Sequence, residues 1–271
     1  MRGRFSSRPS STVAYYCMNV FYLKLLVTPV LMLAISLAAK RWGTAIGGLL
    51  SGLPITSALV MLFLSLEQGP EFASKAVPGA LAGLAAIQAT YLFYFLATRR
   101  VSAVTGCIAA LAVYGASAFL ISLAGSLVLS ILATLALIVV IIVATSKQMQ
   151  TPAAPYVPLP HWAIPLRMLT ATLLLLAITA SATWLGPVIS GLLAPIPVIA
   201  WPLAVFAHVQ SGRHELAAII RGNAIGAVGV VGFYLTLKVS IVQWGVPVSI
   251  TLAVLLAVVI TAGLARLLGK R

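Results

Sequence analysis

Long apolar runs fill almost the whole chain, and they constrain its fold more than any other feature. Nine of them approach the ~20 residues that a helix needs to cross the ~30 Å hydrocarbon core of a bilayer. In lipid every backbone N–H and C=O has to be paired within the segment, so the runs predict helices rather than strands. They cover residues 22–39, 45–66, 76–98, 101–122, 125–145, 166–184, 188–209, 219–238 and 246–266. We therefore expect an all-α, polytopic membrane protein of about nine transmembrane helices.

Composition supports this class, because 62% of the residues are hydrophobic and only 7% are charged. The net charge of +14 does not indicate nucleic-acid binding, since the Lys and Arg residues stand singly or in pairs between apolar runs. Cys17 and Cys107 have no spacing typical of a disulfide or a metal site. We expect no cofactor, no metal and no nucleic-acid partner. The expected partners are the lipid bilayer and a small-molecule or lipid substrate, and a homo-oligomer stays open.

The basic residues also predict an orientation. With nine spans, one face carries Lys40, Arg41, Arg99, Arg100, Lys147, Arg213, Arg221, Arg266, Lys270 and Arg271. By the positive-inside rule this face is cytoplasmic, which places the C-terminus inside and the N-terminus outside a cell inner (plasma) membrane. The tail, residues 1–21, is uninformative, and both Met1 and Met18 remain candidate start residues.

An internal duplication is indicated when the sequence is aligned with itself. One constant shift, called here the repeat offset, places Gly43 on Gly186, Pro54 on Pro197 and Gly69 on Gly212, without a gap. The predicted units are repeat 1 (22–146, five helices) and repeat 2 (166–271, four helices), joined by a Pro-rich linker (147–165). Because five helices precede the second unit, it has to start from the other face of the membrane, so we expect an inverted repeat.

Glycines and prolines interrupt two corresponding spans, at residues 47–54 in the second span and 191–202 in the seventh. Proline removes a backbone donor, so Pro54, Pro195, Pro197 and Pro202 should kink or break these helices. Paired interruptions at membrane depth point to a transport site, whereas small residues that only permit close packing are the alternative. The predicted substrate-binding residues are Gly48, Ser51, Gly52, Pro54, Thr56, Gly191, Pro195, Pro197 and His208.

Carboxylates are scarce: the chain has Glu67, Glu71 and Glu215 and no aspartate. The chain therefore lacks the carboxylates that a hydrolytic carboxylate pair or a carboxylate-bridged metal site requires, and we do not expect an enzyme. Glu67, at the end of a span, is expected on a solvated face. Arg213 and Glu215 are expected as solvated charges in a short loop. His208 suits an interfacial position at least as well as a proton relay.

The pattern G-L-L-x-x-x-P, followed by an apolar run and a closing glycine, occurs at 48–69 and 191–212. Here the chain resembles the GlpM-like family of small bacterial inner-membrane proteins, and the second copy includes His208 before Gly212. The resemblance covers about a fifth of each half and implies no defined reaction. The inverted duplication is also similar in architecture to the drug/metabolite transporter superfamily, although a tenth span is missing.

These features favour a small secondary transporter or exporter with its site between the two interrupted helices. Scarce buried charge indicates a neutral, amphipathic or lipid-like solute. A non-transporting membrane scaffold or accessory subunit is the main alternative, and an integral membrane enzyme acting on lipid is a third. A scaffold needs a stripe of small residues facing lipid, whereas a carrier needs its glycines and prolines turned inward.

Overall fold

The computed structural model of the protein describes residues 20–31, 33, 34, 37, 41, 52–149, 162–197 and 200–269. These residues are helical apart from short connections, and they contain no strand. A helical segment, Val20–Leu31, comes first. It is followed by α2 (Ile55–Gln68), α3 (Pro70–Ala97), α4 (Ala103–Leu123), α5 (Leu127–Met149), α6 (Ala163–Leu193), α7 (Ala200–Trp244) and α8 (Val246–Gly269).

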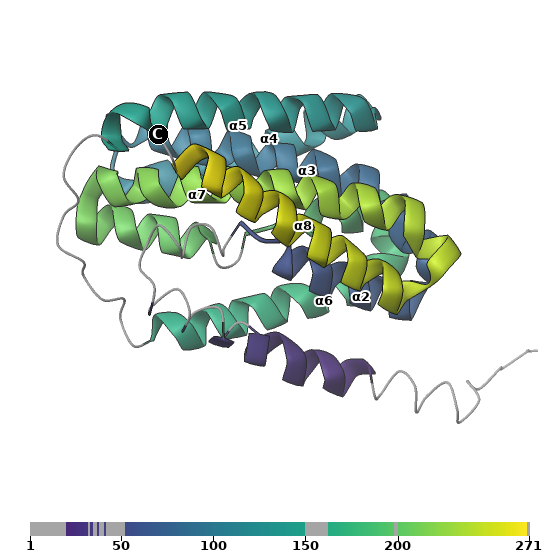
Figure 1. Ribbon diagram of the computed structural model, residues 1–271. Helices are drawn as coiled ribbons and strands as arrows, with labels where there is room; N and C mark the ends of the chain where they lie inside the picture. Colours follow the sequence, from purple (N-terminus) through teal and green to yellow (C-terminus); the bar gives the residue numbers. More distant parts are fainter. Residues whose placement is uncertain are drawn as a thin grey trace, which may run out of the picture.

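Helix α3 forms the centre of the bundle and contacts α2, α4, α5, α6 and α7. Figure 1 shows α4 and α5 along one edge of the molecule and the purple Val20–Leu31 segment along another, beside α6. In the most apolar part of α3, 72% of the residues are buried, against 17% in α4 and 22% in both α5 and α8. Helices α4, α5 and α8 therefore present mostly apolar outer surfaces, as expected of helices that face lipid.

Six helices of the described chain are long and apolar enough to cross a membrane, namely α3 to α8. This confirms the expectation of an all-α, polytopic membrane protein. Helix α7 has 45 residues, which would make it about 67 Å long if it were straight, more than twice the hydrocarbon thickness. It is divided instead by a sharp break at Gly212.

Gly212 and Gly69 have nearly the same backbone conformation. Their φ angles are +82° and +91°, and their ψ angles are −166° and 162°. A side chain is strained in this region, so glycine is needed where the chain must leave one helix and start the next at once. Gly69 separates α2 from α3, and Gly212 separates the 200–211 part of α7 from the remainder.

The proline-containing interruptions lie close to where the sequence predicts them. Helix α2 begins directly after Pro54, and residues 194–197, which include Pro195 and Pro197, are not helical. Pro202 does not break a helix: it lies in the first turn of α7, where a missing N–H removes no helical hydrogen bond. A further kink occurs at Gly186, where φ is +72°, in the C-terminal part of α6.

Glycines bring the interrupted segments into backbone contact with α3 and α7. A Cβ added at Gly226 would lie 2.6 Å from Cα of Gly52, and one added at Gly83 would lie 2.9 Å from Cγ of Pro195. A Cβ at Gly79 or Gly191 would meet the backbone carbonyl of Val188 or Ala76, respectively. None of these positions has room for a side chain.

Alanine at Gly79 should therefore destabilise the protein by about 2 kcal/mol, since the added methyl group forces the backbones of α3 and α6 apart. The matched control is Gly115→Ala in α4, where an added Cβ meets nothing within 4 Å and helix propensity favours alanine by up to ~1 kcal/mol. Thermal unfolding in detergent measures both. Equal melting temperatures for the two variants would contradict the contact.

Candidate functional site

The two interruptions meet at a small cavity in the middle of the bundle, called here the central cavity. Gly52, Thr56 and Ser57 line it from the first interruption and the start of α2. Pro195 and Pro197 line it from the second interruption, and α3 and α7 complete it with Leu84, Ile87, Gln88, Asn223, Ala227 and Val230. Its volume of about 30 Å³ holds one or two water molecules.

Gln88 lines this cavity with a buried amide group that has no hydrogen-bond partner. Its side chain is 1% exposed, and neither its amide oxygen nor its amide nitrogen has a hydrogen-bond partner in the protein. A buried polar group without a partner costs about 1–3 kcal/mol, so such groups normally bind water or a ligand. The central cavity is where the Gln88 amide can find one.

A second, larger space adjoins the first and shares Ile87 and Pro197 with it. This aromatic cavity has a volume of about 350 Å³, which is within the range of small-molecule sites. Its other lining residues are Thr90, Tyr91, Leu111, Tyr114, Thr170, Leu174, Ile196, Trp201 and Pro202. The ring of Trp201 packs against Tyr91 and Tyr94 at centroid distances of 5.6 and 5.2 Å.

The residues predicted for the site have different positions. Gly52, Thr56, Pro195 and Pro197 line the central cavity together. Pro54 is buried at the start of α2 but is not a lining residue. Gly191 packs against Ala76 on α3, which is the packing role that the sequence left open. Gly48 and Ser51 lie outside the described residues.

His208 lies apart from both cavities. Its Nδ1 atom is 3.1 Å from the hydroxyl oxygen of Tyr94, and the two rings meet edge to face at a centroid distance of 5.6 Å. The structure therefore brings together four of the nine predicted residues in one cavity and places His208 in a separate contact between α3 and α7.

Arg213 and Glu215 are not solvated loop charges, contrary to the expectation from sequence. The guanidinium of Arg213 donates a hydrogen bond of 2.8 Å to the carbonyl oxygen of Phe95, near the C-terminus of α3, and lies 4.6 Å from the centroid of the Phe95 ring. Glu215 is 6% exposed and accepts a contact of 3.3 Å from Nδ1 of His214. The expectation failed because α7 resumes immediately after Gly212, so these residues belong to a packed helix rather than a loop.

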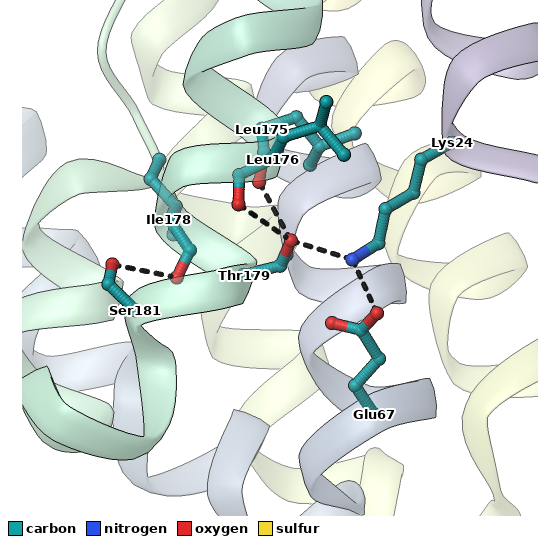
Figure 2. Close-up of polar contacts among 7 residues, drawn as sticks. All are labelled: Lys24, Glu67, Leu175, Leu176, Ile178, Thr179 and Ser181. Atoms are coloured by element: carbon teal, nitrogen blue, oxygen red, sulfur yellow. Dashed lines mark hydrogen bonds and ion pairs between the residues drawn. The ribbon is translucent and has the colours of Figure 1, made fainter. Parts of the chain in front are cut away.

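Glu67 is exposed, as expected of a solvated face, but it also forms an ion pair with a buried lysine. Lys24 in the Val20–Leu31 segment is 3% exposed, and its Nζ is 2.5 Å from Oε1 of Glu67 at the end of α2. Figure 2 shows this Nζ between Glu67 and Thr179 of α6, to whose hydroxyl it donates at 2.6 Å. The Thr179 hydroxyl in turn donates to the Leu175 carbonyl at 2.9 Å. The network joins three helical elements.

Sequence reasoning missed three parts of this arrangement. Lys24 and Glu67 are 43 residues apart, and no local pattern links them. Gln88 is visible as a polar residue within an apolar run, which was a usable signal. Tyr91 and Trp201 carry no signal that separates cavity residues from ordinary core residues.

Neither cavity contains a charged lining residue. The arrangement is therefore suited to bind neutral groups through hydrogen bonds and apolar surface. In comparisons with known proteins, no protein-family profile, curated protein or solved structure matches the chain.

Removing the carboxylate of this ion pair should be costly, because Lys24 is buried. Glu67→Leu leaves the Lys24 ammonium without its carboxylate, and we expect a loss of about 3 kcal/mol in the free energy of unfolding. Lys24→Met leaves only the exposed Glu67 carboxylate, which water can solvate, and should cost less. The double variant Lys24→Met/Glu67→Leu should recover part of this loss, because it removes both charges. Unfolding by SDS titration measures the three free energies.

The control is Lys75→Met, which breaks an exposed pair with Glu71 at 3.6 Å and should change nothing measurable. If the Lys24 and Glu67 replacements were simply additive in the double variant, the two side chains would not be energetically coupled.

Proposed function

We propose that the protein is a small secondary transporter or exporter of a neutral, amphipathic or lipid-like solute. The observation that carries this proposal is the central cavity, where both interrupted helices meet around the unpartnered amide of Gln88. Interrupted helices that enclose a polar cavity at the middle of a bundle are typical of transporter sites. The resemblance to the GlpM-like family implies no reaction, so the proposal stands on this geometry.

The proposal includes nine spans in two inverted repeats, and helix boundaries support it. At the repeat offset, Pro70 corresponds to Arg213 and Ala103 to Val246. Pro70, Ala103 and Val246 each begin a helix, and Arg213 follows the break at Gly212. Gly69 and Gly212, which share an unusual backbone conformation, are equivalent at the same offset.

A pair of reciprocal contacts gives independent support. Gly83 contacts Pro195, and Gly226 contacts Gly52. At the repeat offset, Gly83 corresponds to Gly226 and Gly52 to Pro195. Each interrupted segment therefore packs on the long helix of the other half, as a two-fold relation between two repeats would produce.

In this proposal the two halves rock about the central cavity, so that it opens first to one side of the membrane and then to the other. Contacts between glycines allow such movement because they involve backbone rather than interlocking side chains. The transporter resides in the bacterial inner membrane with its C-terminus in the cytoplasm, in keeping with the positive-inside rule.

A membrane scaffold is the main alternative, and the glycines bear on it. Gly52, Gly83, Gly191 and Gly226 all contact backbone inside the bundle, whereas Gly115 on α4 and Gly263 on α8 have open space beside them. Within the described helices, these two glycines on different helices do not form the continuous outward stripe that a scaffold of this kind needs. The inward positions favour the transporter.

Inverted repeats predict that equivalent loops lie on opposite sides of the membrane. Arg100 and Gln243 are exposed and equivalent at the repeat offset, so cysteines replacing them should react with an impermeant maleimide from opposite sides. If α3 to α8 alone crossed the membrane, four helices would separate the two loops, and both cysteines would react from the same side. Maleimide labelling of each cysteine is compared between intact cells and inverted membrane vesicles.

The control pair for this topology experiment is Arg100→Cys and Lys147→Cys. Only α4 and α5 separate these exposed positions, so both should react from one side under either topology. All variants are made in a background in which Cys17 and Cys107 are replaced by serine or alanine. Labelling of Arg100→Cys and Gln243→Cys from the same side would contradict the inverted repeat.

A transporter also requires that its site be reached from both sides. Ala227, which lines the central cavity, is 2% exposed, and Ala224 on the same helix is 0% exposed but lines neither the central nor the aromatic cavity. In the same background, Ala227→Cys should react with a small impermeant thiol reagent applied from either side, while Ala224→Cys should stay unreactive. Protection of Ala227→Cys from both sides would contradict alternating access.

A further inference from the structure

The aromatic cavity lies where the bundle meets its outer apolar surface. Leu111 of α4 lines the cavity and is 59% exposed, and Thr170 of α6 on its other rim is also exposed. The neighbouring outward residues are Ile108 on α4 and Leu169 and Leu173 on α6, each more than half exposed. The opening between α4 and α6 is therefore surrounded by side chains suited to lipid rather than water.

Hydroxyl groups in the cavity are almost all used within the protein. Thr90 donates to the Ala86 carbonyl at 2.7 Å, and Tyr114 donates to the Leu192 carbonyl at 2.9 Å. Tyr91 differs, because its hydroxyl has no hydrogen-bond partner although the residue is 0% exposed. A buried phenol normally has a partner, so Tyr91 marks the place where a bound molecule presents a polar atom.

Tyr91 lies one helical turn after Gln88 on the same face of α3. Together they give the two adjoining cavities a short row of neutral, unpartnered hydrogen-bonding groups. The remaining volume is lined by apolar and aromatic side chains, and about 350 Å³ has room for roughly a dozen methylene-sized groups, at the ~30 Å³ that one water occupies. An ionic headgroup would find no counter-charge on these walls.

From these observations we infer that the substrate is a single-chain amphiphile with an uncharged hydroxyl headgroup, which reaches the site from the bilayer through the opening between α4 and α6. Its chain occupies the aromatic cavity, and its headgroup bonds to Tyr91 and, after moving inward, to Gln88. This inference rests on the proposed transporter function and specifies the substrate class of the same site.

The test uses the full chain in phosphatidylcholine vesicles and a 12-carbon monoacylglycerol with a diazirine on its chain. Illumination should label residues that line the aromatic cavity, as identified by mass spectrometry of peptides. Leu111→Trp, which fills the opening from an exposed position, should lower this labelling at least ten-fold. Tyr91→Phe keeps the shape of the side chain and removes one hydrogen bond. It should raise the monoacylglycerol concentration that gives half-maximal labelling by about five-fold.

The matched control is Leu120→Trp, which changes an equally lipid-exposed residue of α4 away from the cavity and should label like the wild type. A lysophosphatidic acid carrying the same chain and diazirine tests the headgroup and should label the cavity at least ten-fold less. Unchanged labelling in Leu111→Trp, or equal labelling by the anionic lipid, would overturn the inference.

Failure of this inference is distinguishable from failure of the transporter proposal, because labelling requires no transport. If Ala227→Cys reacts from both sides but the monoacylglycerol does not label the cavity, the substrate class is wrong and the transporter stands. If the lipid labels the cavity but Ala227→Cys is protected from both sides, the lipid site stands and transport is excluded.

Discussion

Hydrocarbon has no hydrogen-bond partners to offer a polypeptide backbone, and this one constraint governs where the chain can depart from a helix. Apart from the connection at residues 98–102, the described chain departs from helix near Gly52 and Pro54, at residues 194–197, and at the glycines with positive φ. The first two departures are enclosed by α3 and α7, with backbone packed directly on backbone through Gly52, Gly83 and Gly226. The polar centre of the molecule exists because freed backbone groups must be kept from lipid.

Three basic side chains of the described bundle follow the same constraint, since each has a defined partner inside the protein. Lys24 bonds to Glu67 and Thr179. Arg213 bonds to the Phe95 carbonyl, and Arg221 donates to the Ile142 carbonyl on α5 at 2.8 Å. Backbone carbonyl oxygens carry partial negative charge, so they can take the place of carboxylates in a chain that has only three acidic residues. A strongly basic composition is thereby compatible with a compact bundle.

Sequence predicted the helical membrane class and the interruption at Pro195 and Pro197, because hydropathy and the geometry of proline act locally. It also pointed to Gly52 and Thr56, which line the central cavity with the two prolines. It was wrong about Arg213 and Glu215, and it did not predict the ion pair of Glu67, since these contacts are decided by helices that are distant in the chain. Gln88 and Tyr91 became distinctive only when their missing hydrogen-bond partners could be seen.

The reciprocal glycine contacts also bear on how the protein is made. During synthesis the first half enters the membrane before its partner surface exists, with Gly52 and Gly83 lacking the helices that cover them in the finished molecule. Those covering segments, around Pro195 and Gly226, emerge from the ribosome only after the whole first half has been made. The early helices therefore lie in the membrane without their packing partners until these later segments are inserted. The bundle can pack completely only in the last part of translation.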